Sequence, residues 1–423
     1  FYLEEDSGAA FVLKIAGAAE QEEILDFQNQ ALRRLAAHHQ AHPERAVGPR
    51  AAFPQPLETR DSQLITRFTR NGRYHLVRLL TYLPGVPLAR VKPHTPQLIT
   101  QAGRFLATVD TALLDFSHPA MHRQLHWDIQ HATSTINRYR HLIPAAEKRA
   151  LVDHFLNQFQ RDVEPHLPRL RHSIIQNDGN DHNLLVSPAK KAPRQIIGLI
   201  DFGDMVYSCT VFEAAVAAAY IMLDKRDPVA AAAQFIAGYH AVLPLTEQEL
   251  ALLPTLIAIR LCTSVALSAH QQSQEPDNSY LSISEQPAWD LLQRLAAIPS
   301  PLFHYNLRHA CSLTPYPEAG KLTTWLQENQ TQAADLLPRK LATTDLQVLD
   351  LSVASPALGD PTVPPQVTND KLQIGRYNEA RLLYAGDAFQ TAYGERRTIH
   401  IGLDLFQPAG TPIYAPLAGT IHS

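Results

Sequence analysis

Hydrophobic and polar residues change their spacing along the chain, and these changes mark the predicted elements. Short alternating runs rich in β-branched residues occur at 11–15, 62–70 and 73–82, and a period of two predicts strands. Apolar residues recur at helical spacing over 20–40, which predicts a helix. Asn71-Gly72, between the last two runs, is a hairpin signal. We therefore expect a small β-rich lobe with one helix at the N-terminal end.

The pattern becomes mainly helical after residue 95. Two short apolar strands, one before Asp178 and one before Asp201, interrupt it. Breaks at Pro or Asn-rich turns separate the predicted helices. These helices are 96–116, 129–141, 145–163, 209–223, 228–242, 246–271 and 285–298.

Beyond residue 345 the composition shifts to Pro, Gly and alternating runs. Strands are predicted at 346–353, 380–386, 397–405 and 412–422. The fold class is therefore α+β, with a β-rich lobe, a larger helical lobe and a partial all-β C-terminal domain. The predicted domains are 1–85, 86–305, a helical linker at 306–345, and 346–423.

Two apolar strands each deliver a carboxylate to an exposed end. Asp178 leads a polar turn with Asn183 five positions later, and Asp201 ends the second strand just before Phe202-Gly203. This is the layout of a protein-kinase-type catalytic core. In it, Asp178 would receive the proton of an attacking hydroxyl, and the oxygens of Asn183 and Asp201 would hold Mg²⁺. The alternative to a catalytic role is that the polar turn is an ordinary hairpin turn on a degenerate kinase scaffold.

The same loop carries a family resemblance. Asn180-Asp181-His182-Asn183 resembles the aminoglycoside phosphotransferase and choline kinase superfamily, in its hydroxylysine-kinase-like branch. The resemblance implies a two-lobe kinase-like fold that uses ATP or GTP with Mg²⁺. It also implies phosphate transfer to a hydroxyl of a small amine-bearing metabolite, an amino-alcohol or amino acid. Gln176 and Asn177 replace the family's His and Gly, which predicts weaker support of the loop.

The resemblance also implies a nucleotide site. Lys14 would contact the phosphates, and the position that usually carries its Glu partner is Gln28, so a neutral hydrogen bond is expected there. Glu22 and Glu23 are alternative acidic partners. Three residues resemble the hinge whose backbone would bind the adenine edge, although a simple connector is equally compatible: Thr81, Tyr82 and Leu83.

Two further expectations concern the parts around this site. The phosphate-covering hairpin would precede the strand of Lys14, and Phe1 begins so close to it that this hairpin is expected to lie outside the sequence. Acidic side chains of the helical lobe would hold the amine of the acceptor. The candidates are Asp181, Asp204, Glu213 and Asp224.

A second motif lies near the C-terminal end. The run from His400 through Asp404 to Gly419 resembles the start of an M23-type zinc metallopeptidase domain, in which such a His and Asp bind Zn²⁺. The later His-x-His of that family would fall after Ser423, so His400 and Asp404 are an incomplete candidate zinc pair. The combination resembles bacterial fusions with a class III aminotransferase, which implies further C-terminal domains.

Composition excludes several other classes. The net charge is −4 and basic residues form no stripe, which argues against nucleic acid as the partner. No continuous run of 18 apolar residues occurs, so no membrane partner is expected. Cys209 and Cys262 are predicted core thiols, and with Cys311 they form no CxxC pair, which suits a cytoplasmic protein. The competing functions are a nucleotide-binding pseudokinase or scaffold and, less favoured, a zinc peptidase.

Overall fold

The computed structural model describes residues 1–41, 53–70, 72–188, 193–274, 285–338, 345–355, 371–382 and 398–420. The chain divides into two compact units, Phe1–Pro315 and Tyr316–Ser423. The division falls at a Pro-Tyr-Pro sequence that cannot continue a helix.

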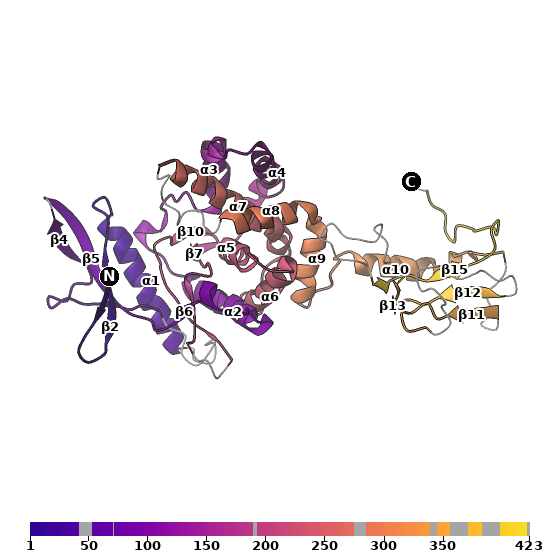
Figure 1. Cartoon of the computed structure of the whole chain (residues 1–423), viewed down its shortest axis with the longest axis horizontal. Coiled ribbons are helices and arrows are strands. Elements are labelled where there is room, and N and C mark those ends of the chain that lie inside the picture. Colours follow the sequence, from indigo (N-terminus) through magenta and orange to yellow (C-terminus); the bar gives the residue numbers. More distant parts are fainter. Residues whose placement is uncertain are drawn as a thin grey trace. The chain divides into compact units, whose positions relative to one another are not determined.

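The N-terminal lobe of the first unit is an antiparallel sheet with one helix (Figure 1). Its strands are β1 (Tyr2–Glu4), β2 (Ala10–Ile15), β3 (Pro56–Leu57), β4 (Thr66–Arg70) and β5 (Arg73–Thr81), and its helix is α1 (Glu22–Ala41). The strand order is β1-β2-β5-β3, and β4 also pairs with β5. The predicted helix and strands of this lobe are confirmed, with bounds shifted by a few residues.

The turn between β4 and β5 supports the hairpin prediction as far as it is described. Arg70 pairs with Arg73, which leaves a two-residue turn. Gly72 has a φ of +72°, a conformation that glycine adopts without strain. Asn71 lies outside the described residues.

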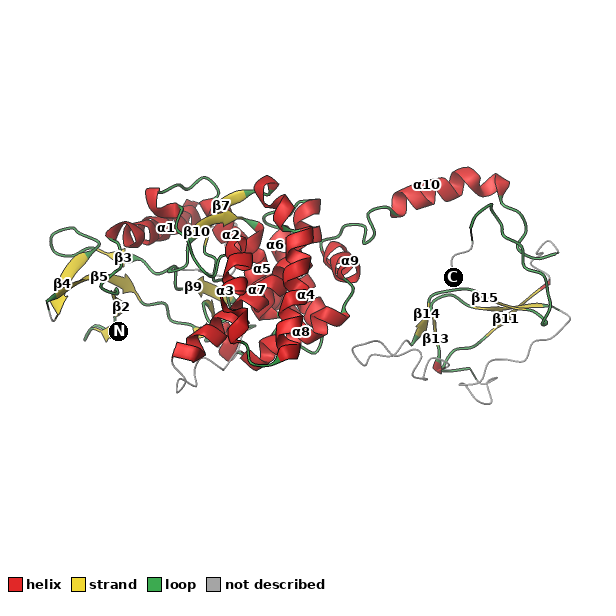
Figure 2. Ribbon diagram, turned by 90° about the horizontal axis from the view of Figure 1, so that it is seen from above, coloured by secondary structure: helices red, strands yellow, loops and turns green. Residues whose placement is uncertain are grey.

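The helical lobe is built around one buried helix. Its helices are α2 (Pro96–Leu113), α3 (Ala132–Tyr139), α4 (Ala146–Asp162), α5 (Val211–Ile221), α6 (Pro228–His240), α7 (Glu247–Gln274), α8 (Glu285–Ala297) and α9 (Ser300–Ala310). Helices α3, α4, α5, α8 and α9 all pack on α7, which Figure 2 shows near the middle of the bundle. All seven helices predicted for this lobe form.

Two glycines allow α2 and α6 to approach closely. A Cβ on Gly103 would lie 2.0 Å from the carbonyl oxygen of Phe235, and one on Gly238 would lie 2.1 Å from that of Thr100. Side-chain caps fix where both helices begin: Thr95 accepts from the N–H of Leu98 at 3.2 Å, and Asp227 from that of Ala230 at 2.9 Å. Helix α2 also packs against the strand β7 (His172–Ile175).

Two small sheets, most of whose strands fall between α4 and α5 in the sequence, carry the loops of the site. One is β6 (Val86–Pro87), β8 (Leu184–Val186) and β9 (Ile196–Leu199), in the order β6-β8-β9. The other pairs β7 (His172–Ile175) with β10 (Val206–Cys209) in antiparallel register. Nearly all residues of β7 to β10 are buried. The two short apolar runs predicted β7 and β9, the strands before Asp178 and Asp201.

Helix α7 is the described element that bears on the prediction of no membrane partner. By length and composition alone it is apolar enough to cross a membrane, and it is the one such helix of 18 or more residues in the described part of the chain. Most of its apolar stretch is buried inside the helical lobe, as in the core helix of a folded protein. The cytoplasmic location stays a prediction.

The three cysteines are free thiols, and Cys209 and Cys262 are buried, as predicted. Burial raises the pKa of the Cys209 thiol to about 12, so it stays protonated near neutral pH. These two cysteines are core residues rather than nucleophiles.

The second unit contains one helix and short strands. They are α10 (Ala319–Asn329), β11 (Leu346–Leu349), β12 (Leu372–Gly375), β13 (Glu379–Ala380), β14 (Ile399–His400) and β15 (Asp404–Phe406). β11 pairs in parallel with β12, β12 pairs antiparallel with β15, and β13 pairs with β14.

The sequence predicted these strands less well than those of the first unit. The run at 397–405 divides into β14 and β15, and β12 was not predicted at all. The strand predicted at 412–422 is wrong for residues 412–420, which form no strand, and residues 421 and 422 lie outside the described part. Proline residues at 412 and 416 account for this, because proline donates no hydrogen bond to a ladder.

Candidate active site

The loop after β7 holds the Asp178 side chain in a network of hydrogen bonds. Its carboxylate accepts from Nδ2 of Asn180 at 2.8 Å and from Nδ2 of Asn183 at 2.7 Å. Burial raises the pKa of Asp178 to about 6, and the nearby Arg260 guanidinium acts in the opposite direction. The structure therefore brings together Asp178 and Asn183, two of the residues singled out by their spacing.

Gln176 occupies the place of the family's histidine and forms two hydrogen bonds. Its Nε2 donates to the carbonyl oxygen of Asp201 at 2.5 Å, and its Oε1 accepts from the N–H of Asp178 at 2.9 Å. It thus links the backbones of the two carboxylate-bearing loops. The loop is supported at this position despite the departure from the family pattern.

Asn177 is buried in a left-handed conformation with a φ of +64°, which asparagine tolerates better than most residues. Its N–H donates to Oε2 of Glu213 at 2.7 Å. The buried Glu213 side chain therefore anchors the backbone of the loop at Asn177.

Asp201 lies at the start of the second loop, and it faces the N-terminal lobe. Its Oδ1 is 3.1 Å from Nζ of Lys14 on β2. The N–H of Ile200 donates to the carbonyl oxygen of Asn183 at 3.0 Å, which ties the two loops together. Phe202 is buried and packs edge-on against Phe53 at 6.4 Å between ring centroids. These contacts bring Lys14, Asn183 and Asp201 close together.

A cavity of about 440 Å³ contains this region. Its wall is mostly apolar, which suits a planar base, and it includes the charged groups of Lys14 and Asp201. The residues that line it are Val12, Lys14, Leu32, Pro54, Arg78, Leu80, Thr81, Tyr82, Leu83, Gly85, Pro87, Arg90, Leu185, Ile200, Asp201 and Phe202. All the nucleotide-site candidates from the sequence line it except Gln28.

Gln28 has a different partner from the expected one. Its amide oxygen accepts a hydrogen bond from Nη2 of Arg78, and Asn29 accepts from Nη1 of the same side chain at 3.0 Å. Glu22 pairs with Arg67 at 3.0 Å. The sequence could not reveal this arrangement, because Arg78 on β5 is 50 positions from Gln28 on α1.

Arg260 on α7 is a site residue that sequence reasoning missed. Its Nη2 lies 3.6 Å from Oδ1 of Asp178, and its Nη1 donates to the carbonyl oxygen of Trp127 at 2.8 Å. The guanidinium also lies over the rings of Trp127 and Tyr220 at 5.1 and 5.7 Å. A signal was available, because Arg260 is the one charged residue between Glu249 and Glu275, and a lone buried charge needs a partner.

The four acidic candidates for the acceptor amine have different surroundings. Glu213 is fully buried under the catalytic loop, and burial raises its pKa to about 7. Asp224 is exposed, and Asp181 is half-buried, with its carbonyl oxygen accepting from Ala89. Asp204 is half-buried, with Arg260, Asp201 and Arg123 as charged neighbours. Asp204 and Glu213 both have Arg260 as a charged neighbour, as Asp178 does, and of these two candidates Asp204 is the one that is partly exposed.

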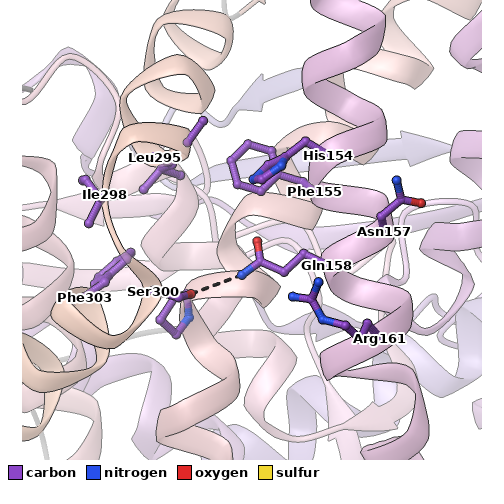
Figure 3. Close-up of a pocket in the computed structure, with 11 residues that line it drawn as sticks. His154, Phe155, Asn157, Gln158, Arg161, Leu295, Ile298, Ser300 and Phe303 are labelled. Atoms are coloured by element: carbon purple, nitrogen blue, oxygen red, sulfur yellow. Dashed lines mark hydrogen bonds between the residues drawn. The ribbon is translucent and has the colours of Figure 1, made fainter. Parts of the chain in front are cut away.

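A second cavity, of about 350 Å³, lies among helices of the same lobe (Figure 3). Its polar rim comes mainly from α4, including His154, Asn157 and Arg161, and Nε2 of Gln158 donates to Oγ of Ser300 at 3.2 Å across it. None of the candidate catalytic residues lines it.

In the second unit, the candidate zinc pair is close but incomplete. Nε2 of His400 lies 3.3 Å from Oδ1 of Asp404. The two residues belong to different short strands, β14 and β15, rather than to one face of a single strand as predicted. Oδ2 of Asp404 also accepts from Nη1 of Arg381 at 2.5 Å. Among the described residues, no three His, Cys, Asp or Glu side chains come together as a metal site.

Comparison with known proteins agrees with this geometry. The model of the family described as "Phosphotransferase enzyme family" matches residues 1–253. The chain is 32% identical over 303 residues to the hydroxylysine kinase of Danio rerio, which covers 70% of this chain and 82% of that protein. It is also 32% identical to the hydroxylysine kinase of Mus musculus, covering 69% of this chain and 78% of that protein.

Two solved structures share the fold of the first unit at low identity. The microcompartment-associated aminopropanol kinase has a TM-score of 0.52 at 18% identity, covering 73% of this chain and 89% of that one. An amicoumacin kinase in complex with AMP-PNP and Ca²⁺ has a TM-score of 0.51 at 14% identity, covering 69% and 84%. The first unit thus has the two-lobe α+β kinase-like fold, and the chain belongs to the phosphotransferase enzyme family as a small-molecule kinase.

Proposed function

We propose that this kinase transfers the γ-phosphate of ATP or GTP to a hydroxyl of a small amine-bearing metabolite, of the hydroxylysine or amino-alcohol type. The observation that carries the proposal is the linked set of Asp178, Asn183, Asp201 and Lys14. Asn183 bonds directly to Asp178, Gln176 links Asp178 to Asp201, and Asp201 pairs with Lys14.

Asp178 would act on the acceptor. The attacking hydroxyl gives its proton to the Asp178 carboxylate while its oxygen forms a bond to the γ-phosphorus. The bond from that phosphorus to the β–γ bridging oxygen breaks, and the nucleoside diphosphate leaves. The hydrogen bonds from Asn180 and Asn183 fix the carboxylate in one orientation for this step.

Lys14 and the segment after β5 would hold the nucleotide. Lys14 lines the cavity together with Thr81, Tyr82 and Leu83. The N–H groups of Thr81 and Tyr82 already donate to Gln55 and Ala10. Within the described part of the chain the N–H of Leu83 donates to no acceptor, so it suits the adenine edge.

Asn183 and Asp201 fit a magnesium ion. Nδ2 of Asn183 donates to Asp178, so the amide oxygen of Asn183 is left as a metal ligand. Asp201 supplies a carboxylate. These are hard oxygen ligands of the kind Mg²⁺ prefers. When bound, Mg²⁺ would neutralise charge on the transferring phosphate.

The acceptor class rests on the relatives and on Asp204. The names hydroxylysine kinase and aminopropanol kinase both describe a hydroxyl near an amine. Asp204 lies near Asp178 in the field of Arg260 and would pair with the ammonium group. Burial raises the pKa of Asp204, and an ammonium partner would lower it again.

Turnover of nucleotide against a panel of acceptors tests the proposal. The panel contains 5-hydroxylysine, 1-amino-2-propanol, ethanolamine, homoserine and choline, with Mg²⁺ present and then removed by chelation. Acceptor-dependent, Mg²⁺-dependent release of the nucleoside diphosphate is expected for at least one amine-bearing acceptor and not for its deaminated analogue. Nucleotide binding without turnover for any acceptor would instead identify a pseudokinase.

For the second unit we propose an M23-like β structure without peptidase chemistry of its own. The juxtaposition of His400 and Asp404 supports the resemblance. A zinc site would require at least one further protein ligand, and the Asp404 carboxylate already accepts a hydrogen bond from Arg381. Zinc titration of the protein and of a His400→Ala variant tests this: equal, weak binding is expected, and tight binding lost in the variant would contradict it.

A further inference from the structure

Arg78 and Lys14 are direct partners across the sheet. In the antiparallel register of β2 and β5, Lys14 lies opposite Arg78, and both side chains line the cavity of about 440 Å³. Side chains directly opposite each other have Cβ atoms about 5 Å apart, and two like charges there are destabilising. The pair is therefore suited to an anion that approaches both cations.

Arg78 is buried, and no carboxylate of the described residues pairs with it. It is 4% exposed, and its described hydrogen-bond partners are two neutral amides, Oε1 of Gln28 and Oδ1 of Asn29. Its buried Nε has no hydrogen-bond partner within the described ranges. The Asp201 and Glu20 carboxylates act on Arg78 only at longer range and offset part of the cost of burying its charge. A buried cation whose direct partners are neutral gains further from a ligand that supplies a negative charge.

Gln28 and Asn29 fix the direction of this side chain. They are consecutive residues of α1, and each accepts from a different Nη atom of Arg78. A glutamate in place of Gln28 would neutralise the guanidinium, whereas the amide orients it and leaves its charge available. This role for the side-chain amide accounts for Gln28 at a position where the family usually has glutamate.

We propose that Arg78 is a second phosphate-binding residue of the nucleotide site, and that Gln28 and Asn29 are positioning residues that orient it. This inference rests on the proposed function, since it assigns the anion to a nucleotide. Helix α1 then acts on the phosphates through Arg78, while Lys14 faces Asp201. Burial lowers the pKa of Arg78 to about 10, so the side chain is still charged at neutral pH.

The competing role for Arg78 is purely structural: it would link β5 to α1 through its hydrogen bonds and contact no ligand. Both roles predict some loss of stability when Arg78 is replaced. The two roles differ in how the affinity for a nucleotide depends on its phosphates, because a purely structural residue does not distinguish adenosine from ATP.

Isothermal titration of the full chain with adenosine, AMP, ADP and ATP separates the two roles. The variants are Arg78→Met and Gln28→Glu, and Arg33→Met is the control, because Arg33 is an exposed arginine of α1 that pairs with Glu58. For Arg78→Met we expect ATP and ADP affinity to fall about tenfold or more, as for a lost charge-assisted hydrogen bond, with adenosine affinity within twofold of wild type.

Gln28→Glu keeps the arginine and its contact, so it remains informative if Arg78→Met folds poorly. We expect weaker ATP binding, unchanged adenosine binding and a melting temperature no lower than that of wild type. Equal changes for adenosine and ATP, or none for either, would overturn the inference, as would wild-type protein that binds ATP no more tightly than adenosine. Wild-type protein that binds ATP but phosphorylates no acceptor would overturn the proposed function alone.

Discussion

Lys14 and Asp201 are 187 positions apart in the sequence, and their charged groups meet at 3.1 Å. The ion pair joins β2 of the N-terminal lobe to the loop after β9. Both side chains are more than one third exposed, so solvent screens the attraction and the pair contributes little to stability. Its position at the cavity of about 440 Å³ agrees with the proposed role of Lys14 in nucleotide binding.

Replacing Lys14 with Met should therefore impair the reaction while leaving the fold intact. We expect kcat/KM for the nucleotide to fall about 100-fold, which is the usual cost of losing one preorganised electrostatic contact. The melting temperature should change by less than about 2 °C. The control is Lys321→Met on α10, an exposed lysine paired with Glu318. An unchanged kcat/KM would remove Lys14 from the site.

Replacing Arg260 with Met should lower kcat more than it affects nucleotide binding. Its guanidinium is the described cation nearest Asp178, at 3.6 Å, and it stacks on Trp127 and Tyr220. We expect kcat to fall at least tenfold, with the nucleotide Kd within about twofold, because Arg260 is not among the residues that line the nucleotide cavity. A matched control is Arg294→Met on α8, whose guanidinium contacts only backbone carbonyls in the described part. A changed Kd with unchanged kcat would contradict this role.

Glu213 should make the free enzyme less stable as the pH rises. Burial raises its pKa from 4.5 to about 7, so the folded state retains a proton that the unfolded state has lost. Stability is therefore highest below pH 4.5 with respect to this group and falls as the pH rises towards 7. The groups that face it are Asp110, Asp178, Arg260 and Tyr239.

Glu213→Gln, which resembles the protonated acid, should remove this dependence. Each pKa unit corresponds to about 1.4 kcal/mol, so at pH 8 the variant should be more stable than wild type by on the order of 3 kcal/mol. At pH 5 the difference should be small. Thermal unfolding followed by circular dichroism at both pH values measures this, with the exposed Glu22→Gln as control. A variant less stable than wild type at pH 8 would refute it.

Gly179→Ala should damage the loop beside Asp178. A Cβ at this position would lie 2.5 Å from Oε1 of Glu213 and 2.9 Å from Cδ1 of Leu106. Because both neighbours are buried, we expect a loss of about 1–3 kcal/mol of stability and at least a tenfold loss of kcat. Gly17→Ala is the control, because a Cβ added to Gly17 would have no described neighbour within 4 Å. Full activity of Gly179→Ala would show that the loop can shift.

Local patterns predicted the parts of the structure that local sequence determines. The helices of the helical lobe follow from their apolar spacing, and the loop of Asp178 and Asn183 follows from two residues five positions apart. Long-range partners were harder to predict. The Gln28–Arg78 contact joins α1 to β5 across 50 positions, and Arg260 reaches Asp178 only after α7 packs in the core.

The second unit was predicted least well for a related reason. Its strands are two to four residues long, too short for a period of two to be distinctive, and prolines interrupt the last predicted run. The His400–Asp404 proximity was expected from one strand but arises from two.

The most direct test of the central claim is product formation by wild-type protein and by Asp178→Asn, followed by ³¹P NMR. With Mg²⁺, ATP and the best acceptor of the panel, wild-type protein should produce a phosphomonoester of the acceptor. The variant should bind ATP with similar affinity but form this product about 10²–10⁴-fold more slowly, the usual contribution of a general base. A variant that forms the phosphomonoester at the wild-type rate would contradict the assignment of Asp178 as the catalytic base.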